Sequence, residues 1–268
     1  DEYCKDQRDK LPGACIEFMT RKRDKPFFAV ASFINPHDIC FAYNARQPNR
    51  KGKPLVDKIY KEAQALPADK LPPLPKNSAI PEREPDAIEA TMKVTAVTPA
   101  KLIRKDYNDR DWRNYRWIYC RLTERVDAQI GRLVTFLQDT GCYDNTLIVF
   151  TSDHGEMLGD HWQLAKFSYF DQTFHVPLIV RDPRPEATPW HGRVIDAFTE
   201  NVDVMPTIVD WLGLEVPSTC DGESLLGFCR SEESIPWRTA AHFALDFRFF
   251  CDDDGGIIGL KEDQCAFA

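Results

Sequence analysis

An aspartate and a histidine directly follow a short apolar run near the middle of the chain. In TLIVFTSDHG, the apolar and β-branched residues from Thr146 to Phe150 lead into Asp153 and His154. A carboxylate oxygen and an imidazole nitrogen are both ligands of divalent cations, and this pair alone does not separate Ca, Mn, Mg and Zn. Two ligands do not complete a site, so others must come from elsewhere. The alternative is that Asp153 caps the next turn and His154 packs in a loop.

Two further side chains could act on an anionic substrate. Lys166 follows His154 by twelve residues, and an ammonium group there could neutralise a substrate oxygen. His37, in the stretch INPHD, could donate a proton to a leaving oxygen near neutral pH. The alternatives are a solvated surface lysine and a histidine that caps or packs in its turn. We interpret the other histidines as structural: His161, His175, His191 and His242.

Alternating apolar runs and helical patterns predict an α/β fold with a largely parallel sheet. The run Phe27–Phe33 is typical of a strand buried on both faces. Further strands are predicted within YDNTLIVFTSDHG and within HVPLIVRDP. Because the carboxyl ends of parallel strands lie at one edge, where α/β sheets bind ligands, we expect His37 beside Asp153 and His154.

The longest predicted helix runs from Asp109 to Gln138 and ends before Gly141. Its apolar stripe is Val126, Ile130, Leu133 and Leu137. A short helix is predicted in DVMPTIVDWLGLEVP, and RTAAHFALDFRFF could be a strand. We expect a core domain at 1–230, in which the proline-rich segment 41–107 covers the site. Residues 231–268 would begin a C-terminal subdomain.

Composition limits the function classes. The chain has 268 residues and a net charge of −8, which argues against a nucleic-acid groove as the main feature. No apolar run reaches the roughly 18 residues of a membrane span. The nine cysteines include no C-x-x-C pair, so we expect reduced thiols and a cytoplasmic protein, with a periplasmic or secreted location as the alternative. An oligomer is possible.

Several of these stretches resemble the sulfatase family of the alkaline phosphatase superfamily. PFFAVASFINPHD, DAQIGRLVTFLQDTGCYDNTLIVFTSDHG and TSDHGEMLGDHWQLAKFSYFDQTFHVPLIVRDPRP occur in the family's order, as does TENVDVMPTIVDWLGLEVP. CDGESLLGF, WRTAAHFALDFRFF and IIGLKEDQC are most similar to the phosphonate monoester hydrolase and arylsulfatase branch. The resemblance covers roughly residues 25–40 and 110–268, and it is weakest in 41–107.

The resemblance implies a layered alkaline-phosphatase-like fold, with a central, largely parallel sheet flanked by helices and incomplete at the N-terminus. It implies that Asp153 and His154 bind one divalent metal ion, most simply Ca or Mn. Lys166 would contact the sulfuryl or phosphoryl oxygens, and His37 the scissile ester. The implied activity is hydrolysis of sulfate monoesters, with a small anionic ester as substrate. Alternatives are phosphonate monoester or phosphodiester hydrolysis, and a non-catalytic binding module with the same fold.

The chain departs from the family pattern at the nucleophile. Family members carry an aspartate pair that completes the metal site, followed by C-x-P-x-R or S-x-P-x-R, whose Cys or Ser becomes formylglycine. None of the nine cysteines lies in that context, and we expect the motif to be absent. Residues 1–268 alone are therefore expected to show no sulfatase turnover.

Overall fold

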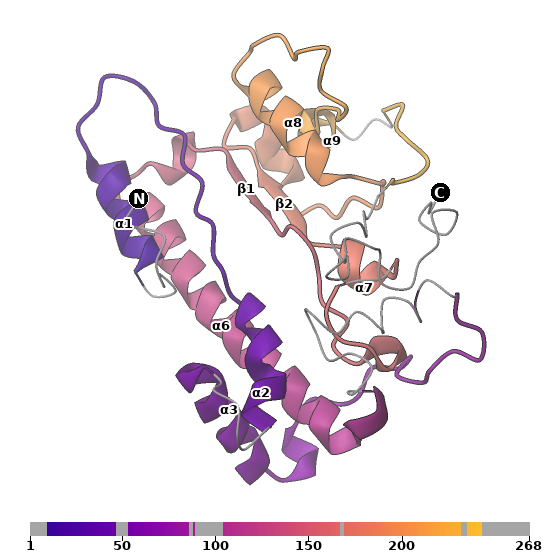
Figure 1. Ribbon diagram of the computed structural model, residues 1–268. Coiled ribbons are helices and arrows are strands. Elements are labelled where there is room, and N and C mark those ends of the chain that lie inside the picture. Colours follow the sequence, from indigo (N-terminus) through magenta and orange to yellow (C-terminus); the bar gives the residue numbers. More distant parts are fainter. Residues whose placement is uncertain are drawn as a thin grey trace, which may run out of the picture. The chain divides into compact units, whose positions relative to one another are not determined.

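The computed structural model describes residues 10–46, 53–85, 88, 104–166, 169–231 and 235–242 (Figure 1). The chain divides into two compact units. Unit 1 is Asp1–Thr140 with Glu156–Ala165, and unit 2 is Gly141–Gly155 with Lys166–Ala268. This division was not foreseen from the sequence, and the boundary at residue 231 stays a prediction.

Unit 1 is helical in the residues that the structure describes. Its helices are α1 (Leu11–Thr20), α2 (Ala42–Arg46), α3 (Pro54–Ala65) and α6 (Asp109–Asp139), with 3-10 turns η2 (His37–Phe41), η3 (Ala68–Lys70) and η5 (Asp160–Trp162). Both α1 and α3 pack against α6, which is the long helix of Figure 1.

The ends of α6 follow from local hydrogen bonding. The Asn108 side chain accepts from the Asp111 amide at 3.1 Å, and the Asp111 carboxylate accepts from the Asn108 amide at 3.1 Å. This reciprocal pair satisfies two backbone donors that the first turn leaves unbonded. At the other end, Gly141 has φ +70°, a conformation that glycine adopts without strain. The predicted helix Asp109–Gln138 is confirmed to within one residue.

The core of unit 1 is built from the first half of α6. Trp112, Ile118 and Leu122 are fully buried, and Val56 and Ile59 of α3 are buried in the same cluster. The predicted apolar stripe continues this face toward the C-terminus, but only its last residue, Leu137, is buried. The hydrophobic stabilisation of α6 therefore comes mainly from aromatic and aliphatic residues before the predicted stripe.

The apolar run Phe27–Phe33 forms no strand with any described residue, contrary to the sequence prediction. The Phe27 ring packs edge-on to Phe18 of α1, with centroids 6.4 Å apart. Phe28 and Val30, by contrast, are 70% and 73% exposed. A strand buried on both faces needs neighbours that complete its backbone hydrogen bonds, and the described residues offer this run none.

Unit 2 holds one two-stranded sheet among its described residues. Its elements are η4 (Tyr143–Asn145), β1 (Ile148–Thr151), α7 (Asp171–Phe174), β2 (Leu178–Arg181), η6 (Pro185–Trp190), η7 (Asn201–Asp203), α8 (Val204–Trp211) and α9 (Leu226–Arg230). Both strands and the helix at α8 lie where the sequence predicts them.

The two strands pair antiparallel, with Ile148 opposite Arg181 and Thr151 opposite Leu178. The sequence predicts a largely parallel sheet, so the predicted direction is wrong for this pair of strands. A parallel connection needs a crossover, usually a helix, that carries the chain back along the strand. Between β1 and β2 the longest α-helix is α7, with four residues, so the chain re-enters the sheet at the edge where it left.

Two buried aspartates link the segments of unit 2. Asp182 is 1% exposed and accepts from Trp211 Nε1 at 2.9 Å and Arg230 Nε at 2.6 Å. Burial acts to raise the pKa of Asp182, but hydrogen bonds from Trp211, the Arg184 amide and Arg230 outweigh it and hold the pKa below its ordinary value. Asp203, fully buried, binds Arg238 through both carboxylate oxygens at 2.6 and 2.8 Å.

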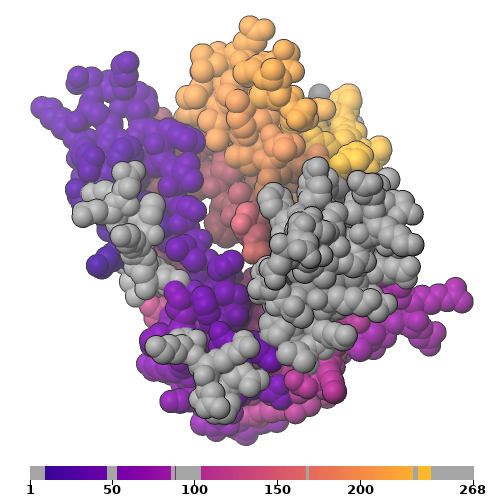
Figure 2. Space-filling model, viewed as in Figure 1, coloured from indigo at the N-terminus to yellow at the C-terminus, as the bar shows by residue number. Residues whose placement is uncertain are grey.

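The later part of unit 2, whose residues Figure 2 draws in orange according to their sequence position, has several exposed apolar side chains. Val194, Met205 and Leu214 are 83%, 50% and 61% exposed.

Among the helices that the structure describes, none is long and apolar enough to cross a membrane. Cys15, Cys142 and Cys229 are free thiols, and burial raises the pKa of Cys15 and Cys229.

Candidate metal and anion site

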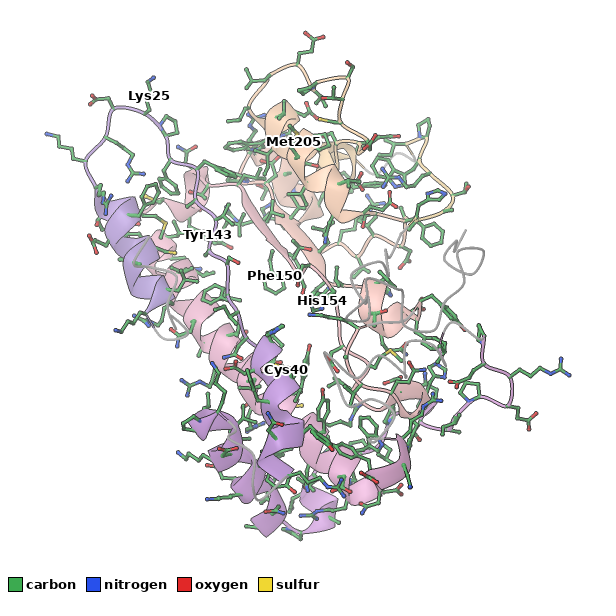
Figure 3. The ribbon with its side chains drawn as sticks, in the orientation of Figure 1. Lys25, Cys40, Tyr143, Phe150, His154 and Met205 are labelled. Atoms are coloured by element: carbon green, nitrogen blue, oxygen red, sulfur yellow. The ribbon has the colours of Figure 1, made fainter. Side chains whose placement is uncertain are left out.

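Asp153 and His154 lie just beyond the end of β1, and Figure 3 labels His154 there. The Ser152 hydroxyl donates to the His154 carbonyl at 2.8 Å, and the Asp153 carboxylate accepts from the His154 amide at 3.0 Å. These short-range bonds turn the chain immediately after the strand. The turn lets two adjacent side chains, which would point to opposite faces in a strand, approach the same point.

The His154 ring is oriented by its neighbours. Its Nδ1 lies 2.9 Å from the Gly155 carbonyl oxygen, and a carbonyl can only accept, so Nδ1 carries the proton. The lone pair of a neutral ring is then on Nε2. A backbone carbonyl that holds the other ring nitrogen in this way is the usual support of a metal-binding histidine.

Asp153 supplies an oxygen beside that nitrogen. Its Oδ2 lies 3.5 Å from His154 Nε2, and the Asp153 side chain is 85% exposed. The two donor atoms are close enough to share one coordination sphere, so these residues fit a divalent ion. Within the described residues, no group of three or more His, Cys, Asp or Glu side chains could hold a metal ion. A metal ion at this place would therefore need further ligands besides Asp153 and His154.

Lys166 completes the cluster in unit 2. Its Nζ lies 2.6 Å from His154 Nε2. An ammonium group can only donate, which agrees with a lone pair on that nitrogen. The side chain is half-buried, so its charge is less screened than that of a surface lysine. The sequence prediction that Lys166 approaches the Asp153–His154 pair is consistent with this contact, although its role stays a prediction.

The chain returns from His154 to Lys166 through a closed loop, Glu156–Ala165, which belongs to unit 1. The Met157 amide donates to the Ala165 carbonyl at 2.9 Å, and the Glu156 carboxylate accepts from the Ala165 amide at 2.5 Å. The same carboxylate oxygen accepts from Tyr115 of α6 at 3.0 Å. Burial and Glu156 raise the pKa of the Tyr115 phenol, which therefore stays a donor. The two ends of the loop are joined by these bonds.

Part of this loop has a left-handed backbone. Leu158, His161, Trp162 and Ala165 have φ between +49° and +66°, which costs energy in residues with a side chain. A position of this loop that lies against the Trp112 ring is a glycine. Gly159 has φ +93°, and a Cβ there would lie 3.1 Å from the Trp112 ring. Strain of this kind clusters at functional sites in proteins.

Gly155, next to His154, permits a close backbone approach in unit 2. A Cβ at this position would lie 2.0 Å from the Gln172 carbonyl oxygen. The Gly155 amide donates to the Thr173 carbonyl at 2.8 Å, which ties the turn after β1 to α7. Any side chain at residue 155 would push these two segments apart.

His37 stands in η2 of unit 1 and is exposed, and its amide donates to the Ile34 carbonyl at 3.0 Å. The Asn35 side chain accepts from the Asp38 amide at 3.2 Å in the same turn. Because Asp153, His154 and Lys166 are in unit 2, a shared site with His37 stays a prediction. So does the cover formed by residues 41–107, which belongs to unit 1.

Sequence reasoning missed Asn201 in η7. Its Oδ1 accepts from the Thr151 hydroxyl at 2.8 Å, and its Nδ2 donates to the Ser152 carbonyl at 2.8 Å. Asn201 therefore holds the chain directly before Asp153. Nothing in the residues around it signals this contact, because its partners are about fifty positions earlier.

Comparison with known proteins decides the family. The Sulfatase family model matches residues 8–214, and this range contains all four predicted site residues. The chain belongs to the sulfatase family. Its hydrolase relatives and their solved structures confirm the alkaline-phosphatase-like α/β fold that the resemblance implied.

Individual relatives support the same family. The multifunctional alkaline phosphatase superfamily protein PehA of Trinickia caryophylli is 43% identical over 155 residues, which are 58% of this chain and 30% of that protein. An arylsulfatase of Clostridium perfringens is 29% identical over 93% of this chain and 46% of its own length.

Among solved structures, the phosphonate monoester hydrolase of Agrobacterium radiobacter is similar, with a TM-score of 0.69 and 31% identity. The match covers 97% of this chain and 49% of that one. The chain thus spans less than half the length of these proteins.

One stretch does match the nucleophile motif that was expected to be absent. Ser234–Arg238 reads SIPWR, an S-x-P-x-R pattern, so the expectation was wrong for this form of the motif. Ser234 lies outside the described residues. Arg238 is bound by the buried Asp203 and, at 2.8 Å, by Glu200, and hydrogen bonding to Asp203 raises its pKa. Through these bonds the Arg238 guanidinium links residues 200–203 to the segment that follows Ser234 in the chain.

Proposed function

We propose that this chain provides the metal ligands and the anion-binding lysine of a sulfate monoester hydrolase. The observation that supports it is that Asp153 Oδ2 and Lys166 Nζ both lie close to His154 Nε2 in unit 2. A metal ion on Nε2 would take the lone pair that accepts from Lys166, and the Lys166 ammonium would then donate to a sulfuryl oxygen instead. Membership of a family of hydrolases gives this cluster a chemical context.

Each residue of the cluster has a definite part in that chemistry. Asp153 and His154 would hold a divalent ion, Ca or Mn, whose charge polarises the sulfuryl group of the ester. Lys166 would donate to a sulfuryl oxygen and offset the charge that builds up on it. His37 would protonate the departing alcohol oxygen, as a histidine can near neutral pH.

Metal binding by the purified chain tests the proposal. We expect one Mn²⁺ per chain by electron paramagnetic resonance titration, and loss of that ion in Asp153→Ala and in His154→Ala. Asp196→Ala is the matched control, because Asp196 is an exposed carboxylate of unit 2 outside the cluster. Absence of bound Mn²⁺ in the unaltered chain, or equal binding in all variants, would contradict the proposal.

A second candidate is hydrolysis of phosphonate monoesters or phosphodiesters. The observation in its favour is that two solved structures, each 31% identical to this chain, are phosphonate monoester hydrolases. Both ester classes place one negative charge on a tetrahedral centre, so Lys166 cannot separate them. Because residues 1–268 alone are expected to show no sulfatase turnover, the assay uses a protein that joins this chain to the family's nucleophile segment. A ratio of kcat/KM for 4-nitrophenyl sulfate to that for 4-nitrophenyl phenylphosphonate above one favours the sulfatase, and a ratio below one favours the alternative.

A further inference from the structure

The side chain of Asn201 bridges two consecutive residues at the end of β1. A backbone carbonyl can only accept, so the contact with the Ser152 oxygen fixes Nδ2 as the donor and places Oδ1 against the Thr151 hydroxyl. Both distances are 2.8 Å, which is within the usual range of good hydrogen bonds. The orientation of the Asn201 amide is therefore determined by its partners.

This amide extends the hydrogen bonding of the sheet past its last residue pair. The ladder ends where Thr151 faces Leu178, so the next carbonyl, that of Ser152, needs a donor from outside the strands. Asn201 supplies that donor.

Holding Ser152 also holds the two residues that follow. The Ser152 hydroxyl donates to the His154 carbonyl, and the Asp153 carboxylate receives the His154 amide. If the Ser152 backbone rotated, the first of these bonds would break and the direction of the His154 ring would change. The 3.5 Å approach of Asp153 Oδ2 to His154 Nε2 therefore depends on a fixed Ser152.

Asn201 is itself carried by a rigid element. Two residues later, Asp203 is buried and bound to Arg238, and it also accepts from the Glu223 amide at 2.9 Å. The backbone at Val202 is packed tightly, because a Cβ on Gly222 would lie 2.2 Å from its carbonyl oxygen. Side chains on supported elements keep functional geometry more precisely than those on free loops.

We propose that Asn201 is a positioning residue that holds the Thr151–Ser152 backbone so that Asp153 and His154 converge. Its purpose rests on the proposed function, in which Asp153 and His154 bind the metal ion. The contact of Nδ2 with the Ser152 carbonyl is the essential part, and the contact with Thr151 is secondary, because only the carbonyl belongs to the backbone that carries the ligands.

Backbone amide exchange in the full chain tests this directly. In Asn201→Ala, we expect the His154 and Gly155 amides to exchange about three- to tenfold faster, which corresponds to the loss of one net hydrogen bond. Asn201→Asp should behave alike, because a carboxylate can still accept from Thr151 but cannot donate to Ser152. Thr151→Val should change the rates less than twofold.

The control is Asn145→Ala, because Asn145 is an exposed asparagine of unit 2 whose side chain bonds to no described residue. Unchanged exchange at His154 and Gly155 in Asn201→Ala would overturn the inference. So would an equal acceleration throughout unit 2, because that would show a general loss of stability rather than local positioning.

Mn²⁺ titration of the same variants separates this inference from the proposed function. A weaker Mn²⁺ affinity in Asn201→Ala, with normal affinity in Asn145→Ala, supports both. Unaltered affinity in Asn201→Ala, together with loss of Mn²⁺ in Asp153→Ala, overturns the positioning role and leaves the proposed function standing. If the unaltered chain binds no Mn²⁺, the proposed metal site fails, and the exchange rates alone decide whether Asn201 holds the turn.

Discussion

At the scale of single residues, the 2.6 Å contact of Lys166 with His154 places a positive charge beside a pair of potential metal ligands. A positive charge in this half-buried position attracts an oxyanion more strongly than an exposed lysine does. The contact also shows why the twelve-residue spacing was informative: the loop between the two residues is closed by hydrogen bonds, so its ends meet.

Replacement of Lys166 should therefore weaken anion binding. In Lys166→Met, which keeps most of the aliphatic stem, we expect the affinity for inorganic sulfate to fall about tenfold, through loss of one charge-assisted hydrogen bond. Isothermal titration with sulfate in Mn²⁺ buffer measures it. Lys76→Met, at an exposed position of unit 1, is the control. Equal sulfate affinity in both variants would show that Lys166 does not face the anion.

At the scale of elements, the loop Glu156–Ala165 is shaped by its packing on α6. Besides the bonds of Glu156, the Arg116 guanidinium donates to the Leu158 carbonyl at 3.1 Å, and Met157 is fully buried. These contacts offset the cost of the left-handed residues. Such a loop is recognisable only in the structure, because Leu158, Trp162 and Ala165 are not residue types that signal a positive φ.

Gly159 is the position of this loop that should tolerate substitution least. Gly159→Ala would require a left-handed alanine within 3.1 Å of the Trp112 ring, and we expect it to lower the free energy of unfolding by about 1–3 kcal/mol. Gly13→Ala is the matched control, because nothing lies within 4 Å of its added Cβ and alanine favours the helix α1. Urea denaturation of both variants measures the difference, and equal midpoints would refute the packing argument.

At the scale of the whole molecule, the parts that local patterns determine were predictable. The apolar stripe and the stop at Gly141 located α6, and the apolar runs located β1 and β2. The direction of the strand pair was not predictable from the runs, because it depends on the short α7 connection. In the candidate site, Asp153, His154 and Lys166 lie near one another in sequence, so they could be proposed together. Asn201 could not be proposed, because its partners are about fifty positions earlier and its own neighbourhood carries no signal.

The ion pair of Asp182 and Arg230 makes the stability of the protein depend on acid. The two side chains approach to 2.6 Å, with the Asp182 carboxylate fully buried. Because the pKa of Asp182 is lower in the folded than in the unfolded chain, the unfolded chain binds more protons in acid. The stabilising contribution of the ion pair is therefore complete above about pH 4, the ordinary pKa of an aspartate. It disappears as the pH falls from there through the folded pKa.

We expect Asp182→Asn to be less stable than the unaltered protein at pH 7, by about 3 kcal/mol, because Arg230 loses its charged partner. As the pH falls below about 4, the stability of this variant should also decline less steeply, since the titrating carboxylate is gone. The control is Asp144→Asn, which removes an ion pair with Arg181 at 3.6 Å whose carboxylate is 89% exposed and which should change stability by less than about 1 kcal/mol. Thermal unfolding from pH 3 to pH 7 gives the change of stability with pH for both variants and for the unaltered protein. If the stability of Asp182→Asn fell with pH as steeply as that of the unaltered protein, other carboxylates would determine the acid sensitivity.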